Sequence, residues 1–202
     1  MKLLIASRNA HKIQEIREIF DLPEVEWVSL EAFADLAEVV EDGATFEANA
    51  VKKASELARA TGLWALADDS GLEVTALRNA PGVYSARYAG EPCDHARNNA
   101  KLLRELAGQA DRSARFRCVA ALSDPTGRTQ TVSGCCEGRI TEQPRGVDGF
   151  GYDPLFIPAG FDATFAEMGS GQKNRLSHRG KAMMLAKETW GRLLAAAPDA
   201  FG

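Results

Sequence analysis

The stretch Trp64-Ala65-Leu66-Ala67-Asp68-Asp69-Ser70-Gly71 runs from four apolar residues directly into two adjacent acids. The apolar run predicts a short buried strand, and a second short strand is expected at residues 72–74. Adjacent carboxylates repel each other and are costly to bury unless a cation accompanies them. Ligands of α/β proteins collect at strand ends, and such oxygen ligands suit magnesium. The stretch therefore fits a metal site or, because Asp-Ser-Gly is common turn chemistry, an ordinary turn.

The chain on either side alternates between strand and helix patterns. Apolar runs and period-two alternation predict strands at residues 2–6, 25–30, 116–122, 129–137 and 155–157. Helical spacing and capping residues predict helices at residues 11–20 and 46–61, after Asp94 to about 107, and after Ser177. Because strands and helices interleave and one hairpin is present, we expect an α/β fold with a mixed β-sheet flanked by helices. No linker is visible, so residues 1–202 are expected to form a single domain with two lobes around a central cleft.

The composition restricts the partners of the protein. The 202 residues are 45% hydrophobic and 26% charged, with a formal net charge of -4, which disfavours a general nucleic-acid binder. The apolar runs are too short to span a bilayer, so no membrane partner is expected. The four cysteines lack the spacing of zinc ligands, and reduced thiols are typical of a cytoplasmic protein.

Several polar segments are candidates for binding a phosphorylated ligand. Ser7-Arg8-Asn9-Ala10-His11-Lys12 joins the first strand to the first helix, where backbone N–H groups and the helix dipole favour an anion; an ordinary capped helix is the alternative. Glu41 and Asp42 add carboxylates that either bind a cation or only solvate a loop. Lys52 and Lys53 lie on the second predicted helix, where a solvated face is the simpler interpretation.

Two further segments are candidates for binding a flat ligand. In Gly149-Phe150-Gly151-Tyr152-Asp153-Pro154, glycines flank aromatic residues, so that a base could stack there; a packed turn is the alternative. Lys173 and the stretch Ser177-His178-Arg179-Gly180-Lys181 place cations near the start of the last helix. Cations there oppose the helix dipole, and this unfavourable placement favours a role in ligand binding.

The ordered set of these segments resembles the inosine triphosphatase family, whose members are pyrophosphatases acting on dITP, ITP and XTP. The matching segments, in family order, are Ser7-x-Asn9-x-x-Lys12, Thr45-Phe46-x-x-Asn49-Ala50, Lys53-Ala54, Ala67-Asp68-Asp69-Ser70-Gly71, Pro81-Gly82-Val83-Tyr84-Ser85-Ala86-Arg87-Tyr88, Gly149-Phe150-Gly151-Tyr152-Asp153-Pro154 and Ser177-His178-Arg179-Gly180. Any one of them would be weak evidence, whereas the ordered set covers almost the whole chain and is highly specific.

The resemblance implies an elongated two-lobed mixed-sheet fold, a homodimer, and Mg²⁺-dependent hydrolysis of the triphosphate to the monophosphate and pyrophosphate. It implies that Glu41 and Asp69 bind Mg²⁺ and that Asp69 activates the attacking water. The triphosphate would be held by the loop from Ser7 to Lys12, with Lys53 assisting catalysis, and Ser70 would touch the nucleotide. The base would lie against Phe150, Gly151, Tyr152, Asp153, Lys173, His178 and Arg179.

Two positions depart from the family pattern. Many relatives carry an acid just before Glu41, where this chain has Val40, so Asp42 remains an alternative metal ligand. An acid that is often found beside Asn49 is also absent, because Ala48 stands there.

The sequence therefore predicts an enzyme that removes deaminated purine triphosphates from the nucleotide pool. Two alternatives stay open: a pyrophosphatase for other modified or pyrimidine triphosphates, and a module that binds nucleotides without hydrolysing them.

Overall fold

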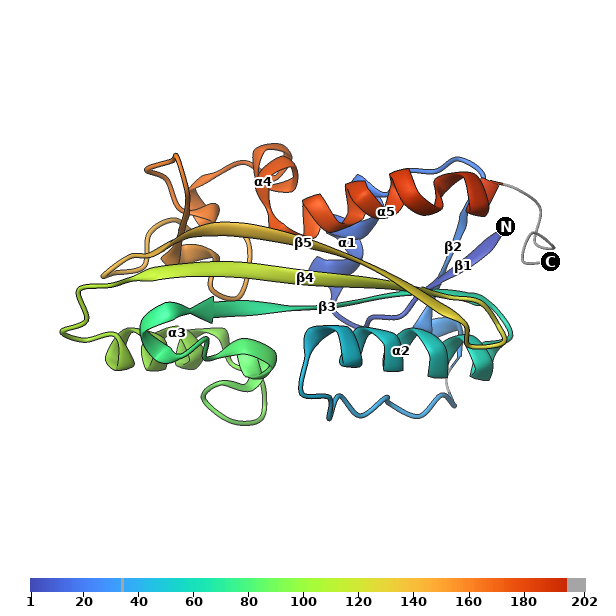
Figure 1. Ribbon diagram of the computed structural model, residues 1–202, viewed down its shortest axis with the longest axis horizontal. Helices are drawn as coiled ribbons and strands as arrows, with labels where there is room; N and C mark the ends of the chain where they lie inside the picture. The colour runs from blue at the N-terminus through green and yellow to red at the C-terminus, as the bar shows by residue number, and fades with distance from the viewer. Residues whose placement is uncertain (34, 196–202) are drawn as a thin grey trace. The chain divides into compact units, whose positions relative to one another are not determined.

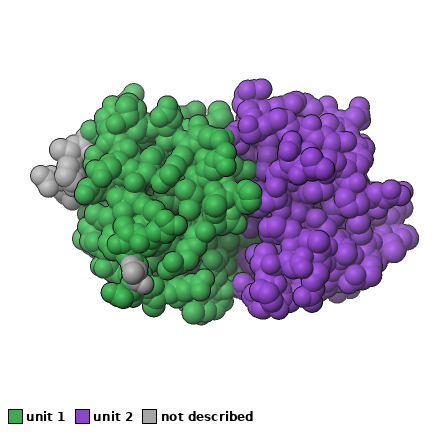
Figure 2. Space-filling view, turned by 180° about the vertical axis from the view of Figure 1, so that it is seen from behind, with its two compact units in different colours: residues 1–69, 118–134, 179–202 green, residues 70–117, 135–178 purple. Residues whose placement is uncertain are grey.

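The computed structural model describes residues 1–33 and 35–195. The chain forms two compact units, which Figure 2 shows in different colours. Unit 1 comprises residues 1–69, 118–134 and 179–202, and unit 2 comprises residues 70–117 and 135–178.

The strands form one six-stranded sheet in the order β2-β1-β3-β4-β5-β6 (Figure 1). Strand β1 pairs in parallel with both β2 and β3, whereas β5 and β6 are antiparallel. The strand bounds are β1 Lys2–Ile5, β2 Glu26–Ser29, β3 Trp64–Val74, β4 Ser113–Ser123, β5 Thr129–Ile140 and β6 Phe156–Pro158. The helices are α1 Ala10–Ile19, α2 Phe46–Thr61, α3 His95–Glu105, α4 Ser170–Leu176 and α5 His178–Ala195. The predicted α/β class and its helix-flanked mixed sheet are confirmed.

Helix α2 begins and ends at the predicted residues. The side-chain oxygen of Thr45 accepts a hydrogen bond from the backbone N–H of Ala48, which is the usual bond of an N-cap. At the other end Gly62 adopts the left-handed conformation with φ of 67°, which is strained for any residue with a Cβ atom. These two residues make the helix bounds readable from the sequence.

In unit 1, helices cover both faces of the sheet: α1 and α5 lie on one face and α2 on the other (Figure 1). The core on the α1 and α5 side includes Leu3, Ile5, Trp64, Leu66 and Trp190. Because successive side chains of a strand point to opposite faces, Leu4 and Ala65 belong to the other face. The same alternation decides where the two acids of β3 point.

One feature of the predicted fold is wrong. The sequence indicates two short strands interrupted at residues 68–71, but β3 is a single strand of 11 residues from Trp64 to Val74. Nearly all of its residues are buried, and its neighbour β1 pairs with it only as far as Leu66. Central burial keeps the polar residues in extended conformation, so Asp68 and Asp69 lie within the strand, just past the end of β1.

Unit 2 has a core of its own, to which β3, α3, β4 and β5 contribute Leu72, Leu102, Phe116 and Ile140. The helix α4 was not predicted from the sequence. Ser177, the predicted N-cap of the last helix, directly precedes α5 and is also the C-cap of α4. No helix within residues 1–33 and 35–195 is long and apolar enough to cross a membrane.

Candidate functional site

The two adjacent acids of β3 face opposite sides of the sheet in unit 1. The side chain of Asp68 points to the same face of the sheet as those of Trp64 and Leu66, toward α1 and α5. The side chain of Asp69 points to the opposite face, as that of Ala65 does, toward α2. Their contacts follow this alternation, because Asp68 meets side chains of α1 and α5 whereas Asp69 meets a side chain of α2. The strand geometry alone therefore gives the two carboxylates different environments.

Asp68 is the centre of a buried network of charges. Its Oδ2 lies 3.1 Å from Nη2 of Arg179 and 3.2 Å from Nζ of Lys12. Arg179 also donates from Nη1 to Oε2 of Glu15 at 2.5 Å. Burial by itself raises the pKa of Asp68, but the charges of Lys12, Arg179 and Lys53 together outweigh burial and lower the pKa well below its usual range. Asp68 is thus a permanently ionised partner of cations.

Asp69 is also buried, with 7% of its surface exposed, but its charge is less well compensated. Its Oδ2 accepts a hydrogen bond of 2.9 Å from Nδ2 of Asn49. Burial raises the pKa of Asp69, and the charges of Lys53 and Lys12 together with the bond from Asn49 only partly offset that effect. Glu41 acts in the same direction as burial, because a nearby like charge disfavours ionisation. The environment of Asp69 therefore suits a group that takes up a proton or a cation.

Lys53 joins the segment that carries Glu41 to strand β3. Its Nζ donates to the backbone oxygen of Asp68 at 2.7 Å and lies 3.1 Å from Oε2 of Glu41. Lys53 is 8% exposed, so the predicted solvated face of α2 does not include it. Lys52 does lie at the surface, where it pairs with Asp42 at 2.7 Å. The structure thus brings Glu41, rather than Asp42, into contact with Lys53.

The predicted phosphate-binding segment, residues 7–12, runs from the connection after β1 into the first turn of α1. Asn9 is the N-cap of α1, and its Oδ1 accepts a hydrogen bond from the N–H of Lys12 at 3.1 Å. Ser7 Oγ accepts one from the N–H of Asn9 at 3.2 Å. The exposed start of α1 therefore presents its positive dipole end, with the charge of Lys12 in the first turn of the helix. Arg8 in the loop and Ala10 and His11 at the start of α1 are exposed.

In unit 2, three of the predicted base-binding residues contact one another. Asp153 Oδ2 accepts hydrogen bonds from Nζ of Lys173 at 2.7 Å and from the N–H of Phe150 at 2.8 Å. The Lys173 ammonium lies 4.9 Å from the centroid of the Phe150 ring, which is cation–π distance. Gly149 has φ of 76°, and a Cβ atom there would lie 2.2 Å from Asp153 Oδ2. Glycine is required at this position because both the conformation and the close approach exclude a side chain.

The other predicted base-binding residues of unit 2 have separate partners. The hydroxyl of the buried Tyr152 donates to the backbone oxygen of Ser85 at 2.9 Å, and burial raises its pKa. Gly151 O accepts from Asn99 Nδ2 at 3.0 Å. His178 is 5% exposed and stacks on Phe116, with ring centroids 4.6 Å apart.

The predicted residues therefore fall into two groups. Unit 1 holds Glu41, Lys53, Asp69, Arg179 and the loop at residues 7–12, and unit 2 holds Ser70, His178, Lys173 and residues 150–153. The guanidinium of Arg179, which the resemblance places in the base pocket, contacts Asp68 and Glu15 within unit 1.

The sequence assigned no role to two residues of unit 1: Glu15, which pairs with Arg179, and Asn49, which donates to Asp69. Glu15 on α1 carries no pattern that distinguishes it from other surface acids. Asn49 does carry a signal, because it is a polar residue on the face of α2 that otherwise buries Phe46, Ala50 and Ala54. A polar interruption of an apolar helix face indicates a buried hydrogen-bond partner.

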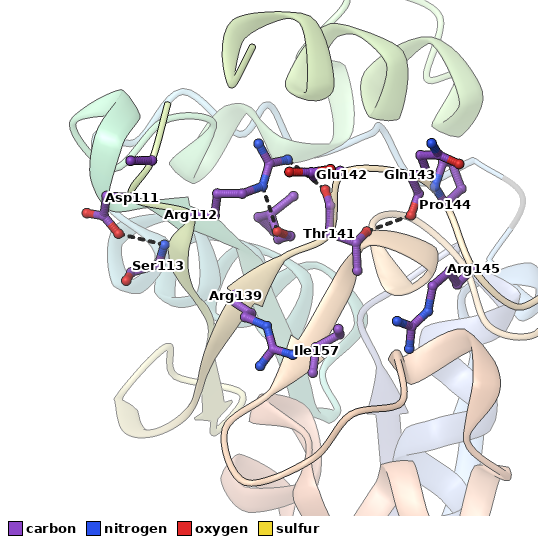
Figure 3. Close-up of a pocket in the computed structure, with 12 residues that line it drawn as sticks. Asp111, Arg112, Ser113, Arg139, Thr141, Glu142, Gln143, Pro144, Arg145 and Ile157 are labelled. Carbon is purple, nitrogen blue, oxygen red and sulfur yellow. Dashed lines mark hydrogen bonds between the residues drawn. The ribbon is translucent and has the colours of Figure 1, made fainter. Parts of the chain in front are cut away.

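A separate hollow of about 650 Å³ in unit 2 contains none of the predicted residues (Figure 3). Arg112 donates there to the backbone oxygens of Leu106, Ile140 and Thr141 and so connects the end of β5 to the residues that follow α3. Arg145 pairs with Glu167 at 2.8 Å. The two arginines are thus occupied by groups of the protein itself.

Comparison with known proteins supports the family resemblance that the sequence motifs indicate. The model of the Ham1 family matches residues 3–189. A protein of Desulforamulus reducens named dITP/XTP pyrophosphatase is 52% identical over 195 residues, which cover 96% of this chain and 97% of that protein. One of Geobacter sulfurreducens with the same name is 52% identical over 192 residues, with 94% and 96% coverage. The structure of the Staphylococcus aureus Ham1 protein superposes with a TM-score of 0.87 at 39% identity, over 96% of this chain and all of that one. The chain therefore belongs to the Ham1 family, and the resemblance read from its motifs is confirmed.

Proposed function

We propose that the protein hydrolyses deaminated purine nucleoside triphosphates, dITP, ITP and XTP, to the monophosphate and pyrophosphate with Mg²⁺, as a single catalytic domain. The names of its relatives support this substrate class. The loop at residues 7–12 binds the triphosphate together with Lys53. Phe150, Tyr152, Asp153, Lys173 and His178 bind the base.

The observation that carries the proposal is the contrast between the two acids. Asp68 is neutralised by Arg179 and Lys12, whereas burial raises the pKa of Asp69 and so favours a proton or a cation at that carboxylate. Asp69 accepts the proton of a water whose oxygen attacks the α-phosphorus. The bond from the α-phosphorus to the bridging oxygen breaks, and pyrophosphate leaves with that oxygen. Asn49 holds the carboxylate while this happens.

The donor set of unit 1 fits a hard divalent cation. Glu41 and Asp69 repel each other, since the charge of Glu41 contributes to the raised pKa of Asp69, and a cation between them would remove that cost. The described residues contain no group of three or more His, Cys, Asp or Glu side chains arranged for a metal. Mg²⁺ typically takes one or two carboxylates and completes its shell with substrate phosphates and water. When bound, it would neutralise the charge that develops on the phosphates.

The base preference follows from hydrogen-bond polarity. A 6-keto purine accepts a hydrogen bond at O6, whereas adenine carries an amino donor there, so a donor at this position selects the keto form. The bonds of Arg179 to Asp68 and Glu15 favour His178 as that donor. Guanine must be rejected by a pocket that is too tight or wrongly polarised for its 2-amino group while still accepting the oxygen of XTP.

The experiment is a panel of triphosphates assayed for kcat/KM, with pyrophosphate and phosphate measured separately, with Mg²⁺ and with EDTA. We expect Mg²⁺-dependent release of pyrophosphate from ITP, dITP and XTP, and its loss in Asp69→Asn. Preference for a pyrimidine triphosphate would overturn the substrate, and binding without any product would overturn the enzyme class. Full activity of folded Asp69→Asn would overturn the role of the carboxylate.

A further inference from the structure

We infer that Asn49 is a positioning residue that joins the segment carrying Glu41 to the carboxylate of Asp69. This inference rests on the proposed function, because it gives the two acids a common task. Asn49 is 1% exposed and lies in the first turn of α2. Its side chain touches both partners, and neither of its two bonds is made to its own helix.

The two bonds define the orientation of the amide. Oδ1 accepts from the backbone N–H of Gly43 at 2.8 Å, and Nδ2 donates to Oδ2 of Asp69 at 2.9 Å. A backbone N–H only donates and an ionised carboxylate only accepts, so the reversed amide would lose both bonds. An asparagine is the residue that can bridge these two groups at this length. The bond to Oδ2 restricts rotation of the Asp69 carboxylate.

Space around Gly43 reinforces the bridge. A Cβ atom at Gly43 would lie 2.6 Å from Asn49 Oδ1 and 2.9 Å from the Cβ of Ala48. Contacts this short require the segment or the amide to move. The absence of a side chain at Gly43 therefore allows the segment to lie against the start of α2 and to keep the hydrogen bond.

Lys53 forms a second bridge one turn further along the helix. Residues four apart lie on the same helix face, so Asn49 and Lys53 act side by side. Lys53 connects Glu41 Oε2 with the backbone oxygen of Asp68, and Asn49 connects Gly43 with the side chain of Asp69. Together they hold the segment at both ends of residues 41–43. A metal ligand on a loop needs such support, because outer-shell partners set its position.

The test compares Asn49→Ala and Gly43→Ala with the unaltered protein. In the metal-free protein without nucleotide, we expect the Gly43 amide to exchange its hydrogen about tenfold faster in Asn49→Ala, which corresponds to loss of one hydrogen bond. Mg²⁺ is then titrated while the melting temperature and the activity are measured. In both variants we expect each half-maximal response to need a roughly 10- to 100-fold higher Mg²⁺ concentration. The nucleotide KM at saturating Mg²⁺ should change less than about twofold, because the metal and not the base is affected.

A matched control is Asn98→Ala. Asn98 is 2% exposed, accepts from the N–H of Ala89 at 2.7 Å and donates to the oxygen of Ala86 at 2.9 Å. Its loss removes the same kind of buried bridge in unit 2, so melting temperature should fall while the Mg²⁺ response stays unchanged. The double variant Gly43→Ala/Asn49→Ala should need no more Mg²⁺ for the half-maximal response than the more affected single variant. Both substitutions break the same bridge between Gly43 and Asn49, so their effects do not add.

Unchanged Mg²⁺ dependence in a folded Asn49→Ala, or an equal change in Asn98→Ala, would overturn the inference. If Asn49→Ala does not fold, Gly43→Ala decides by the same measurements. If the unaltered protein releases no pyrophosphate from any triphosphate, the proposed function fails. Gly43 exchange and the Mg²⁺-dependent melting temperature then still decide whether Asn49 joins the two segments.

Discussion

Replacing each of the two adjacent acids of β3 by asparagine should have opposite consequences. Asp68→Asn removes the charge that neutralises Arg179 and Lys12, and Arg179 is only 2% exposed. Asp69→Asn removes a buried carboxylate whose ionisation is already disfavoured. We expect the first substitution to destabilise the protein with its catalytic groups retained, and the second to abolish activity without loss of stability.

The magnitude for Asp68 follows from its burial. Removing one partner of a buried ion pair costs about 3–5 kcal/mol of unfolding free energy. At about 2–4 °C per kcal/mol for a protein of this size, the melting temperature should fall by roughly 6–20 °C. For Asp69→Asn the melting temperature at pH 7 should stay the same or rise, and kcat should fall at least about 100-fold because the proposed general base is lost.

The dependence on pH distinguishes the two cases. The folded pKa of Asp68 is depressed, so its stabilisation is complete above the unfolded value of 3.8 and is lost as pH falls below it. The folded pKa of Asp69 is raised, so its ionisation costs stability as pH rises above 3.8. When the pH is lowered from 7 to 4.5, the loss of unfolding free energy in Asp68→Asn should therefore persist. Any gain of unfolding free energy in Asp69→Asn should become smaller over the same range.

The assay is thermal unfolding of both variants and the unaltered protein in EDTA at these two pH values, with pyrophosphate release measured in parallel. Equal destabilisation by the two substitutions would refute the reasoning. So would a stable Asp68→Asn, because the buried guanidinium would then need no carboxylate on β3.

The remaining predictions concern unit 2. Phe150→Ala should raise the nucleotide KM about 5- to 150-fold with little change in kcat, because stacking of a base on an aromatic ring contributes about 1–3 kcal/mol; an unchanged KM would exclude stacking. Gly149→Ala should lower the free energy of unfolding by more than about 2 kcal/mol, since it combines φ of 76° with a clash against Asp153. Gly151→Ala is its control, with φ of 62° and open space, and should cost about 1 kcal/mol in chemical denaturation.

Local signals in the sequence predicted most of the elements. Thr45 and Gly62 mark the ends of α2 because capping depends on the residue itself and its nearest neighbours. The alternation around Phe116 predicted β4, although the strand extends further at both ends. The segment at residues 68–71 misled prediction because Asp-Ser-Gly is typical of a turn, and only its central place in the sheet keeps it extended.

The candidate site was read from the sequence as a set of residues, without their contacts. Glu41, Lys53 and Asp69 were named from motifs, and Arg179 was assigned to the base. The structure shows contacts of Arg179 with Asp68 and Glu15, which are 111 and 164 residues away in the chain, so no local pattern could indicate them.

The sequence by itself determined the family and the class of fold and named the candidate site residues, because motifs, periodicity and caps are local properties. Only the tertiary structure decided the environment of each of the two adjacent acids. Asp68 and Asp69 are identical side chains at neighbouring positions, and the pleat of β3 directs them to different helices. One therefore meets cations that lower its pKa, and the other meets an amide and a burial cost that raise it.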